Sequence, residues 1–187
     1  MSEETSTEEE LTTFVGQLSA NGVTLTDTLV IEELTKRGYG DMEKKKLVLR
    51  DYEMLYLTQV GKMTVLRGKK QVKYEDLVEE ALERDSTAWT RFLVYRDLRS
   101  RGYVAKEGFG FGVDFRLYDR GDFGGKAARY VVFGLNEGTE KEAESFRKVG
   151  EDILKMGKEP ILAVVERRGE IIYYKVSKWR PTKSTPK

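Results

Sequence analysis

Apolar and polar side chains alternate over residues 14–26 on both sides of Asn21-Gly22, which predicts a β-hairpin with a two-residue turn. Asp27 or Thr28 then caps a short helix that ends at Gly38. Further along we expect a strand over 47–50, a helical turn over 51–58, strands over 62–66 and 71–73, and an amphipathic helix over 74–84. Together these elements predict a small α/β N-terminal domain over residues 13–84.

The pattern after residue 84 predicts a second unit. Ser86 is a good N-cap for a helix that ends at Gly102, and the buried stripe of this helix holds Trp89, Phe92, Leu93 and Leu98. We expect strands over 103–106, 111–118 and 129–135, a helix over 139–156, and a hairpin that pairs 161–165 with 170–176. This order is typical of an α+β, nuclease-like C-terminal domain over residues 85–180, with a mixed sheet flanked by helices.

The charge is balanced overall but unevenly placed. The chain has 187 residues, 33 of them basic and 32 acidic, and residues 1–10 hold five glutamates and no base. We expect a disordered acidic leader over residues 1–12 and a basic tail over residues 181–187. A second basic cluster contains Lys36, Arg37 and Lys44–Lys46. Such clusters contact phosphates in nucleic-acid-binding proteins or form an ordinary solvated surface, and composition leaves both open.

The absence of cysteine and histidine excludes several kinds of chemistry. The chain has none of either residue, so it has no disulfide, no thiolate zinc site and no thiol nucleophile. It also lacks the usual general acid or base at neutral pH. We expect no metal and no cofactor. No apolar run approaches the roughly 18 residues that span a bilayer, and the first residues are polar, so we expect a cytoplasmic protein with no membrane partner.

One segment carries a recognisable motif. Phe109–Tyr118 reads FGFGVDFRLY, and after a short loop the chain continues Ala127-Ala128-Arg129-Tyr130. This order resembles a core motif of the archaeal tRNA-splicing endonucleases, in which a strand ending in a catalytic tyrosine precedes a His-Ser-x-Tyr sequence. Lys158–Val165 resembles the family segment that bears the catalytic lysine. Residues 92–103 resemble the helix and entry strand before the motif, and residues 47–82 resemble the family's N-terminal domain more loosely.

The resemblance implies a reaction and roles for three positions. Family members cleave precursor tRNA at bulge–helix–bulge type sites without metal, leaving 2′,3′-cyclic phosphate and 5′-hydroxyl ends. By resemblance, Tyr118 is the general base, Lys158 stabilises the charge of the transition state, and Ala127 occupies the position of the general-acid histidine. Since a general acid contributes about 10²–10⁴ in rate, we expect this chain to be nearly inactive as written.

Two explanations of Ala127 remain open. The chain is either a catalytic subunit whose histidine has been replaced or a naturally non-catalytic structural subunit. Retention of Tyr118 and Lys158 favours the first. A metal-dependent nuclease of the restriction-enzyme type is a third hypothesis, but Glu166-Arg167-Arg168 lacks the lysine of the glutamate-x-lysine strand that it requires.

Substrate-binding residues also follow from the resemblance. Lys44, Lys45 and Lys46 lie in a segment similar to an extra basic loop of the heterotetrameric archaeal enzymes, where it binds RNA; the alternative is a flexible charged loop. Trp179 is expected to stack on a flipped base or to lie in a dimer interface. The usual arginine partner is absent, because its position holds Glu151, and Arg147 or Arg180 is the expected substitute.

The resemblance predicts partners as well. We expect precursor tRNA as substrate and a structural endonuclease subunit as partner in an α2β2 assembly, with a homodimer as the alternative. The apolar hairpin over residues 161–176 is expected to mediate self-association. An acidic loop that docks on a neighbouring subunit is expected at Glu137, Glu140 and Glu142.

Overall fold

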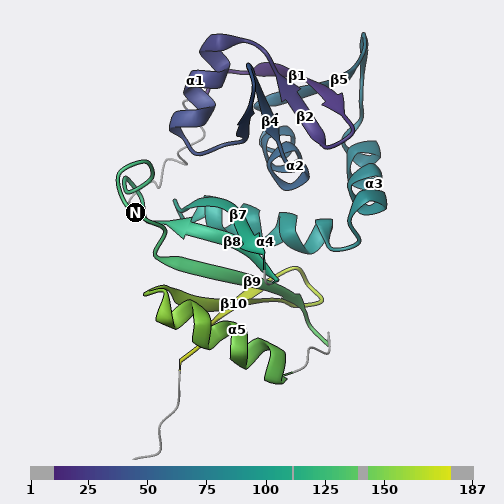
Figure 1. Cartoon of the computed structure of the whole chain (residues 1–187). Helices are drawn as coiled ribbons and strands as arrows, with labels where there is room; N and C mark the ends of the chain where they lie inside the picture. The colour runs from purple at the N-terminus through teal and green to yellow at the C-terminus, as the bar shows by residue number, and fades with distance from the viewer. Residues whose placement is uncertain (1–10, 111, 139–142, 178–187) are drawn as a thin grey trace, which may run out of the picture.

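The computed structural model describes residues 11–110, 112–138 and 143–177, with only the backbone described for residues 143–147, and contains two mixed β-sheets (Figure 1). The N-terminal sheet has the order β3-β4-β2-β1-β5-β6. Its strands are β1 (Phe14–Ser19), β2 (Gly22–Leu25), β3 (Asp41–Glu43), β4 (Lys46–Leu49), β5 (Met63–Arg67) and β6 (Lys70–Gln71). β1 pairs in parallel with β5, and the other pairings are antiparallel.

Local sequence signals set the ends of the first elements. The predicted hairpin with a two-residue turn is confirmed, although β1 and β2 pair across Ala20-Asn21 and Gly22 is the first residue of β2. Asp27 accepts hydrogen bonds from the backbone N–H groups of Leu29 and Val30, at 2.9 and 3.2 Å, and so caps α1 (Thr28–Lys36). Gly38 follows this helix with φ of +80°, a conformation that favours glycine. The remaining N-terminal helices, α2 (Asp51–Gln59) and α3 (Tyr74–Arg84), also lie where they were predicted.

The C-terminal sheet has the order β11-β10-β9-β8-β7. Its strands are β7 (Val104–Gly110), β8 (Val113–Tyr118), β9 (Tyr130–Asn136), β10 (Glu159–Val165) and β11 (Ile171–Lys175). The helix α4 (Ala88–Ser100) covers one face, where Val132 belongs to the main core. The helix α5 (Ala143–Lys155) covers the other, where Val131 and Phe133 pack with Ile153 (Figure 1). Side chains alternate along β9, so neighbouring valines serve opposite layers. The predicted α+β class is confirmed.

Four sequence predictions need correction. A strand, β3, lies where a loop was expected. Three residues are too few for an alternating pattern of apolar and polar side chains to predict a strand. Thr87, not Ser86, is the N-cap residue of α4, and its side chain makes no capping hydrogen bond. The Asp85 carboxylate instead accepts hydrogen bonds from the backbone N–H and hydroxyl of Thr87. Trp89 is 39% exposed rather than part of the buried stripe. Leu11 is buried in the core, so the predicted leader does not extend to residue 12; residues 1–10 lie outside the described part.

A shared aromatic cluster joins the two halves of the chain. Tyr52 from α2 packs edge-on against Phe115 from β8, with ring centroids 5.0 Å apart, and lies 4.9 Å from the ring of Tyr95 in α4. Close by, Lys106 of β7 donates to the backbone carbonyl of Gly40, and its ammonium lies 3.0 Å from Asp41 of β3. A continuous core therefore fixes the N-terminal sheet against the C-terminal one, which matters for any ligand that contacts both.

Candidate active site

Three separate segments of the sequence meet at one end of the C-terminal sheet. β8 runs antiparallel to β9, and β9 runs parallel to β10, so the end of β8 lies beside the starts of β9 and β10. The Arg129 N–H donates to the Leu117 carbonyl at 3.0 Å, and the Glu159 N–H donates to the Arg129 carbonyl at 3.1 Å. This register brings together the segments that contain Tyr118, Ala127 and Lys158.

Tyr118 is the last residue of β8 and is half-buried. Its ring packs edge-on against Phe123, with centroids 5.2 Å apart. Phe123 in turn lies against Gly38 of the N-terminal half, where an added Cβ would come within 3.4 Å of the Phe123 ring and 2.2 Å of Val104. Gly38 is thus required for close approach as well as for its positive φ, and the loop after Tyr118 rests on the end of α1.

Lys158 immediately precedes β10, and its ammonium donates a hydrogen bond to the Ala128 carbonyl at 2.7 Å. An ammonium has three donors, and the Ala128 carbonyl accepts one of them, so Lys158 retains donors for an anionic ligand. Ala127 is exposed beside it, whereas Ala128 is 6% exposed. A larger side chain therefore fits at position 127 without displacing the core.

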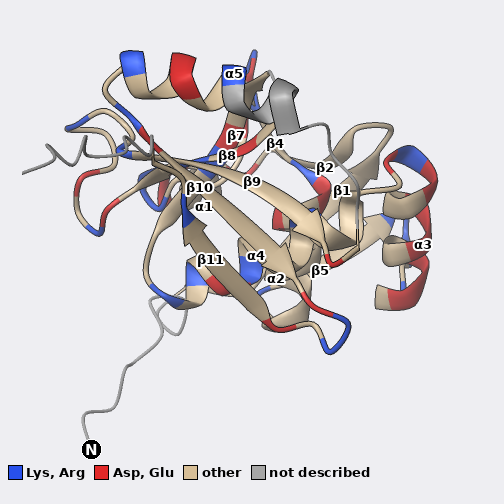
Figure 2. Cartoon of the chain, turned by 90° about the horizontal axis from the view of Figure 1, so that it is seen from below, with Lys and Arg blue, Asp and Glu red and all other residues tan. Residues whose placement is uncertain are grey.

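Charged side chains of both signs border this end of the sheet. The Arg129 guanidinium lies 3.1 Å from Glu159 and 3.7 Å from Asp119, and the Lys175 ammonium lies 2.5 Å from Glu159. Hydrogen bonds from Lys175 and Arg129 hold the pKa of Glu159 below its ordinary value, so this carboxylate stays ionised. Figure 2 shows acidic and basic residues on several other elements, with acidic residues predominating on α3. This end of the sheet therefore carries several cations, and neighbouring carboxylates balance their charge.

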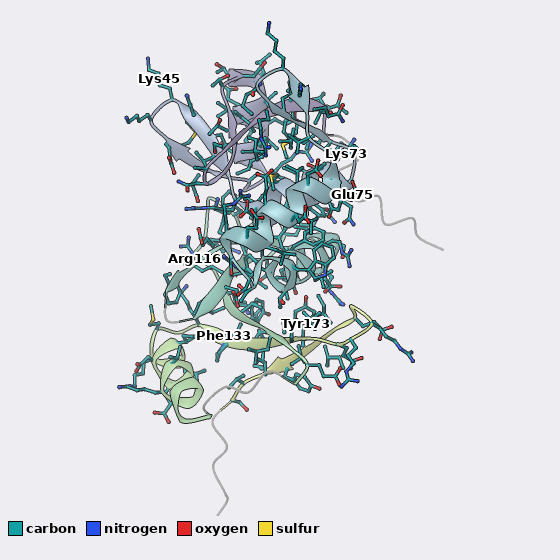
Figure 3. The ribbon with its side chains drawn as sticks, turned by 90° about the vertical axis from the view of Figure 1, so that its right-hand side faces the viewer. Lys45, Lys73, Glu75, Arg116, Phe133 and Tyr173 are labelled. Carbon is teal, nitrogen blue, oxygen red and sulfur yellow. The ribbon has the colours of Figure 1, made fainter. Side chains whose placement is uncertain are left out.

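The predicted RNA-binding lysines lie elsewhere. Lys44 and Lys45 form the turn between β3 and β4, and Lys46 begins β4; all three are exposed, and Lys44 has φ of +59°. Figure 3 shows Lys45 pointing outward from the N-terminal sheet, away from the labelled residues of the C-terminal sheet. The lysine turn therefore belongs to the N-terminal sheet, whereas Tyr118 and Lys158 lie at the end of β8 and the start of β10 in the C-terminal sheet.

Several other predicted residues cannot be placed. Trp179, Arg180, the basic tail, Glu140 and Glu142 lie outside the described residues, and the side chain of Arg147 is not described. Glu137 follows β9, where its carboxylate accepts a hydrogen bond from the Arg167 N–H at 3.3 Å. Glu151 lies within α5.

Sequence reasoning missed two residues of this edge. Phe123 supports Tyr118, yet its only signal is a single aromatic residue in the glycine-rich stretch Asp122-Phe123-Gly124-Gly125. Arg129 appeared only as the variable position of the motif, although its guanidinium lies 4.8 Å from the centre of the Tyr130 ring. Both roles depend on loop conformation, which alternation patterns do not encode.

Metal-ligand clusters and bilayer-spanning helices are both missing from the described residues. There, no group of three or more acidic, histidine or cysteine side chains is arranged to hold a metal ion. In the same residues no helix combines the length and the apolar character that a bilayer-spanning segment needs. The hypothesis of a metal-dependent nuclease therefore receives no support from a ligand cluster.

This geometry defines a class of protein. Its members have two α+β domains, with a tyrosine and a lysine at one edge of a sheet. Residues 88–173 match the family described as tRNA intron endonuclease, catalytic C-terminal domain, and residues 15–78 match its N-terminal domain. The chain is 33% identical over 168 residues to the tRNA-splicing endonuclease of Methanothermobacter thermautotrophicus, covering 89% of this chain and 98% of that one. It is 34% identical over 160 residues to the tRNA-splicing endonuclease of Thermococcus gammatolerans, covering 85% and 94%.

The chain belongs to the tRNA intron endonuclease family. The predicted family is thereby confirmed. The subunit type and the roles of Tyr118, Ala127 and Lys158 remain predictions.

Proposed function

We propose that this chain is a catalytic-type subunit of a metal-independent tRNA-intron endonuclease that cleaves precursor tRNA at bulge–helix–bulge type splice sites. Cleavage leaves 2′,3′-cyclic phosphate and 5′-hydroxyl ends. Because Ala127 replaces the general-acid histidine, this copy cleaves slowly. The observation that carries the proposal is the convergence of Tyr118, the 127–128 segment and Lys158 on one end of the sheet.

The reaction assigns one task to each position. Attack of the 2′-hydroxyl on the neighbouring phosphate requires a group that accepts its proton, and Tyr118 supplies an oxygen at the edge. The phosphorane gains negative charge, which the Lys158 ammonium stabilises with the donors not used on Ala128. The leaving 5′-oxygen requires a proton, and a methyl group at position 127 cannot donate one. The first two tasks are therefore retained and the third is lost.

A restoration experiment tests this proposal. Ala127→His is expected to raise the cleavage rate of a bulge–helix–bulge precursor RNA by about 10²–10⁴ in the presence of a chelator, with 2′,3′-cyclic phosphate ends. Ala127→Gln is the matched control, because its amide is polar and similar in reach but does not transfer a proton at neutral pH. An equal rate for the two variants would contradict the assignment of position 127.

A second candidate is a naturally non-catalytic, RNA-binding structural subunit. It is favoured by the contacts of the two retained residues, since Tyr118 packs on Phe123 and Lys158 holds the Ala128 carbonyl. Such contacts give both residues a structural role that does not depend on catalysis. In this case the unaltered chain supports full cleavage when mixed with a catalytic partner subunit, and Ala127→His adds nothing.

Assembly and the remaining substrate contacts are part of the same proposal. β11 is an edge strand whose Ile172 and Tyr174 are 39% and 52% exposed, and an unpaired edge with apolar side chains favours pairing with another subunit. We infer self-association through the 161–176 hairpin together with a structural partner subunit in an α2β2 complex in the cytoplasm. Lys44–Lys46, Trp179 and Arg180 are proposed to contact RNA. The division at residues 84 and 85 is proposed as the domain boundary.

A further inference from the structure

An open pocket lies beside the candidate active site on the α4 face of the C-terminal sheet. Its volume is about 290 Å³, and Leu98, Leu117 and Ile161 supply its aliphatic wall. That volume is at the lower limit of small-molecule sites, which span roughly 300–1,000 Å³, so the pocket suits one compact ring system. Leu117 immediately precedes Tyr118 in β8, so the pocket lies at the same end of the sheet as the proposed base, on the face covered by α4.

Three tyrosines give the pocket flat aromatic walls. The rings of Tyr103 and Tyr130 lie nearly perpendicular, at 88°, with centroids 6.3 Å apart. Tyr173 of β11 supplies the third ring, and its hydroxyl donates to the Asp97 carboxylate at 2.7 Å. Burial and this hydrogen bond raise the pKa of Tyr173, so the hydroxyl stays protonated and the ring stays fixed. The tyrosine walls therefore have a definite geometry.

Arg101 lines the pocket, and two further cations, Arg129 and Lys175, lie next to its lining residues; all three are paired with carboxylates, Asp97 or Glu159. Arg101 is 54% exposed, lies 5.3 Å from the centre of the Tyr173 ring and is held by Asp97 at 2.7 Å. The Arg129 guanidinium covers the Tyr130 ring at 4.8 Å, and Lys175 pairs across strands with Ile161. Flat aromatic walls inside and basic groups outside match the two parts of a nucleotide, its base and its phosphate.

We propose that this pocket binds one unpaired nucleobase of the RNA substrate, at the same end of the sheet as the Tyr118–Lys158 edge. Proteins read single-stranded RNA by stacking splayed bases on aromatic rings and arginine planes, and the pocket supplies both. The inference rests on the proposed RNA-cleaving function. It adds a base-binding site built from Arg101, Tyr103, Tyr130 and Tyr173, distinct from the predicted contacts of Trp179.

The test is equilibrium binding of the full chain to a bulge–helix–bulge RNA and to versions in which each bulge nucleotide in turn is abasic. One abasic position is expected to weaken binding about tenfold. Tyr103→Leu keeps an apolar side chain but removes the ring. It is expected to weaken binding of the intact RNA about tenfold without further weakening that abasic RNA.

Two further variants make the result specific. Arg101→Gln changes an exposed side chain, so it leaves the fold intact, and it is expected to show the same pattern with a smaller effect. Trp89→Leu removes an exposed aromatic residue at the other end of α4 and is expected to leave RNA binding unchanged.

The outcomes separate this inference from the proposed function. Equal affinity of the chain for bulged RNA and for a fully paired duplex overturns the proposed function. If bulged RNA is preferred but Tyr103→Leu weakens the intact and all abasic RNAs equally, the base-binding pocket is wrong and the function stands. If Tyr103→Leu dissociates a homodimer in sedimentation velocity while RNA affinity is unchanged, a second copy covers the pocket and the inference is overturned.

Discussion

The junction between the two sheets and the edge that holds the candidate active site are built in opposite ways. At the junction, Tyr52, Tyr95 and Phe115 are almost completely buried and contact one another. At the edge, Tyr118 and Lys158 are half-buried and Ala127 is exposed. Substitutions at the junction should therefore act on stability, and substitutions at the edge on chemistry.

The largest effect on stability is expected from removing a buried aromatic side chain at the junction. Phe115→Ala removes a fully buried ring that packs against Tyr52 and Tyr95, so it should lower the free energy of unfolding by about 3–5 kcal/mol in chemical denaturation. Leu29→Ala removes an apolar side chain that is 78% exposed and should change stability by less than about 0.5 kcal/mol. Similar losses for the two variants would mean that the aromatic cluster does not hold the halves together.

The edge should show the reverse behaviour. In the Ala127→His background, Lys158→Ala should lower the cleavage rate by about 10²–10³, because it removes a charge-stabilising donor. Single-turnover cleavage under chelation measures this rate. Denaturation of the same variant should show a much smaller change than Phe115→Ala, since Lys158 makes one backbone hydrogen bond at the edge. A loss of activity that only follows a loss of folded protein would contradict a chemical role.

The pH dependence of the stability contributed by Glu53 gives a second test of the junction. This buried carboxylate accepts from the N–H groups of Gly40 and Arg50, at 2.8 and 2.9 Å. Burial raises its pKa in the folded state above the ordinary 4.5. Folding therefore favours the protonated form, so the Glu53 contribution to stability falls as pH rises from about 4.5 through the raised pKa.

Glu53→Gln should remove this pH-dependent component, because the amide does not titrate. At neutral pH it should also destabilise the protein by about 1–3 kcal/mol, since an amide accepts from only one of the two backbone donors. Denaturation curves across pH measure both effects. If the free energy of unfolding of the variant depends on pH as steeply as that of the unaltered chain, a group other than Glu53 titrates in this pH range.

The smallest effect is expected at the lysine turn. Replacing Lys44, Lys45 and Lys46 by Gln should weaken RNA binding equally for different sequences and lower the salt slope by about 0.7–0.9 for each phosphate that the turn no longer binds. The turn belongs to the N-terminal sheet and contributes no residue to the active-site edge, so the cleavage rate of bound RNA should not change. Lys69→Gln with Lys70→Gln, in the exposed β5–β6 turn, is the matched control. An equal change in slope from the control would mean that the lysine turn does not bind RNA specifically.

Local elements were predictable because their signals are short-range. The Asn21-Gly22 pair indicates the tight turn between β1 and β2, which the pairing places at Ala20-Asn21. Asp27 satisfies backbone donors at the start of α1, and the apolar spacing over residues 74–84 matches a helix. The missed strand β3 is the counterexample. Its pairing with β4 is decided by the neighbouring strand, since three residues carry no usable period.

The candidate site shows the same difference between short-range signals and long-range pairing. The amino-acid order alone predicted the family motif, the position at which the resemblance expects a histidine, and Tyr118, Ala127 and Lys158 as the residues of the site. The folded chain was needed to place the start of β10 beside the start of β9, because parallel pairing joins strands far apart in the chain. The same pairing builds the tyrosine-walled pocket from α4, β8, β9, β10 and β11. Sequence thus fixes which chemical groups are present, whereas long-range strand pairing decides which of them meet.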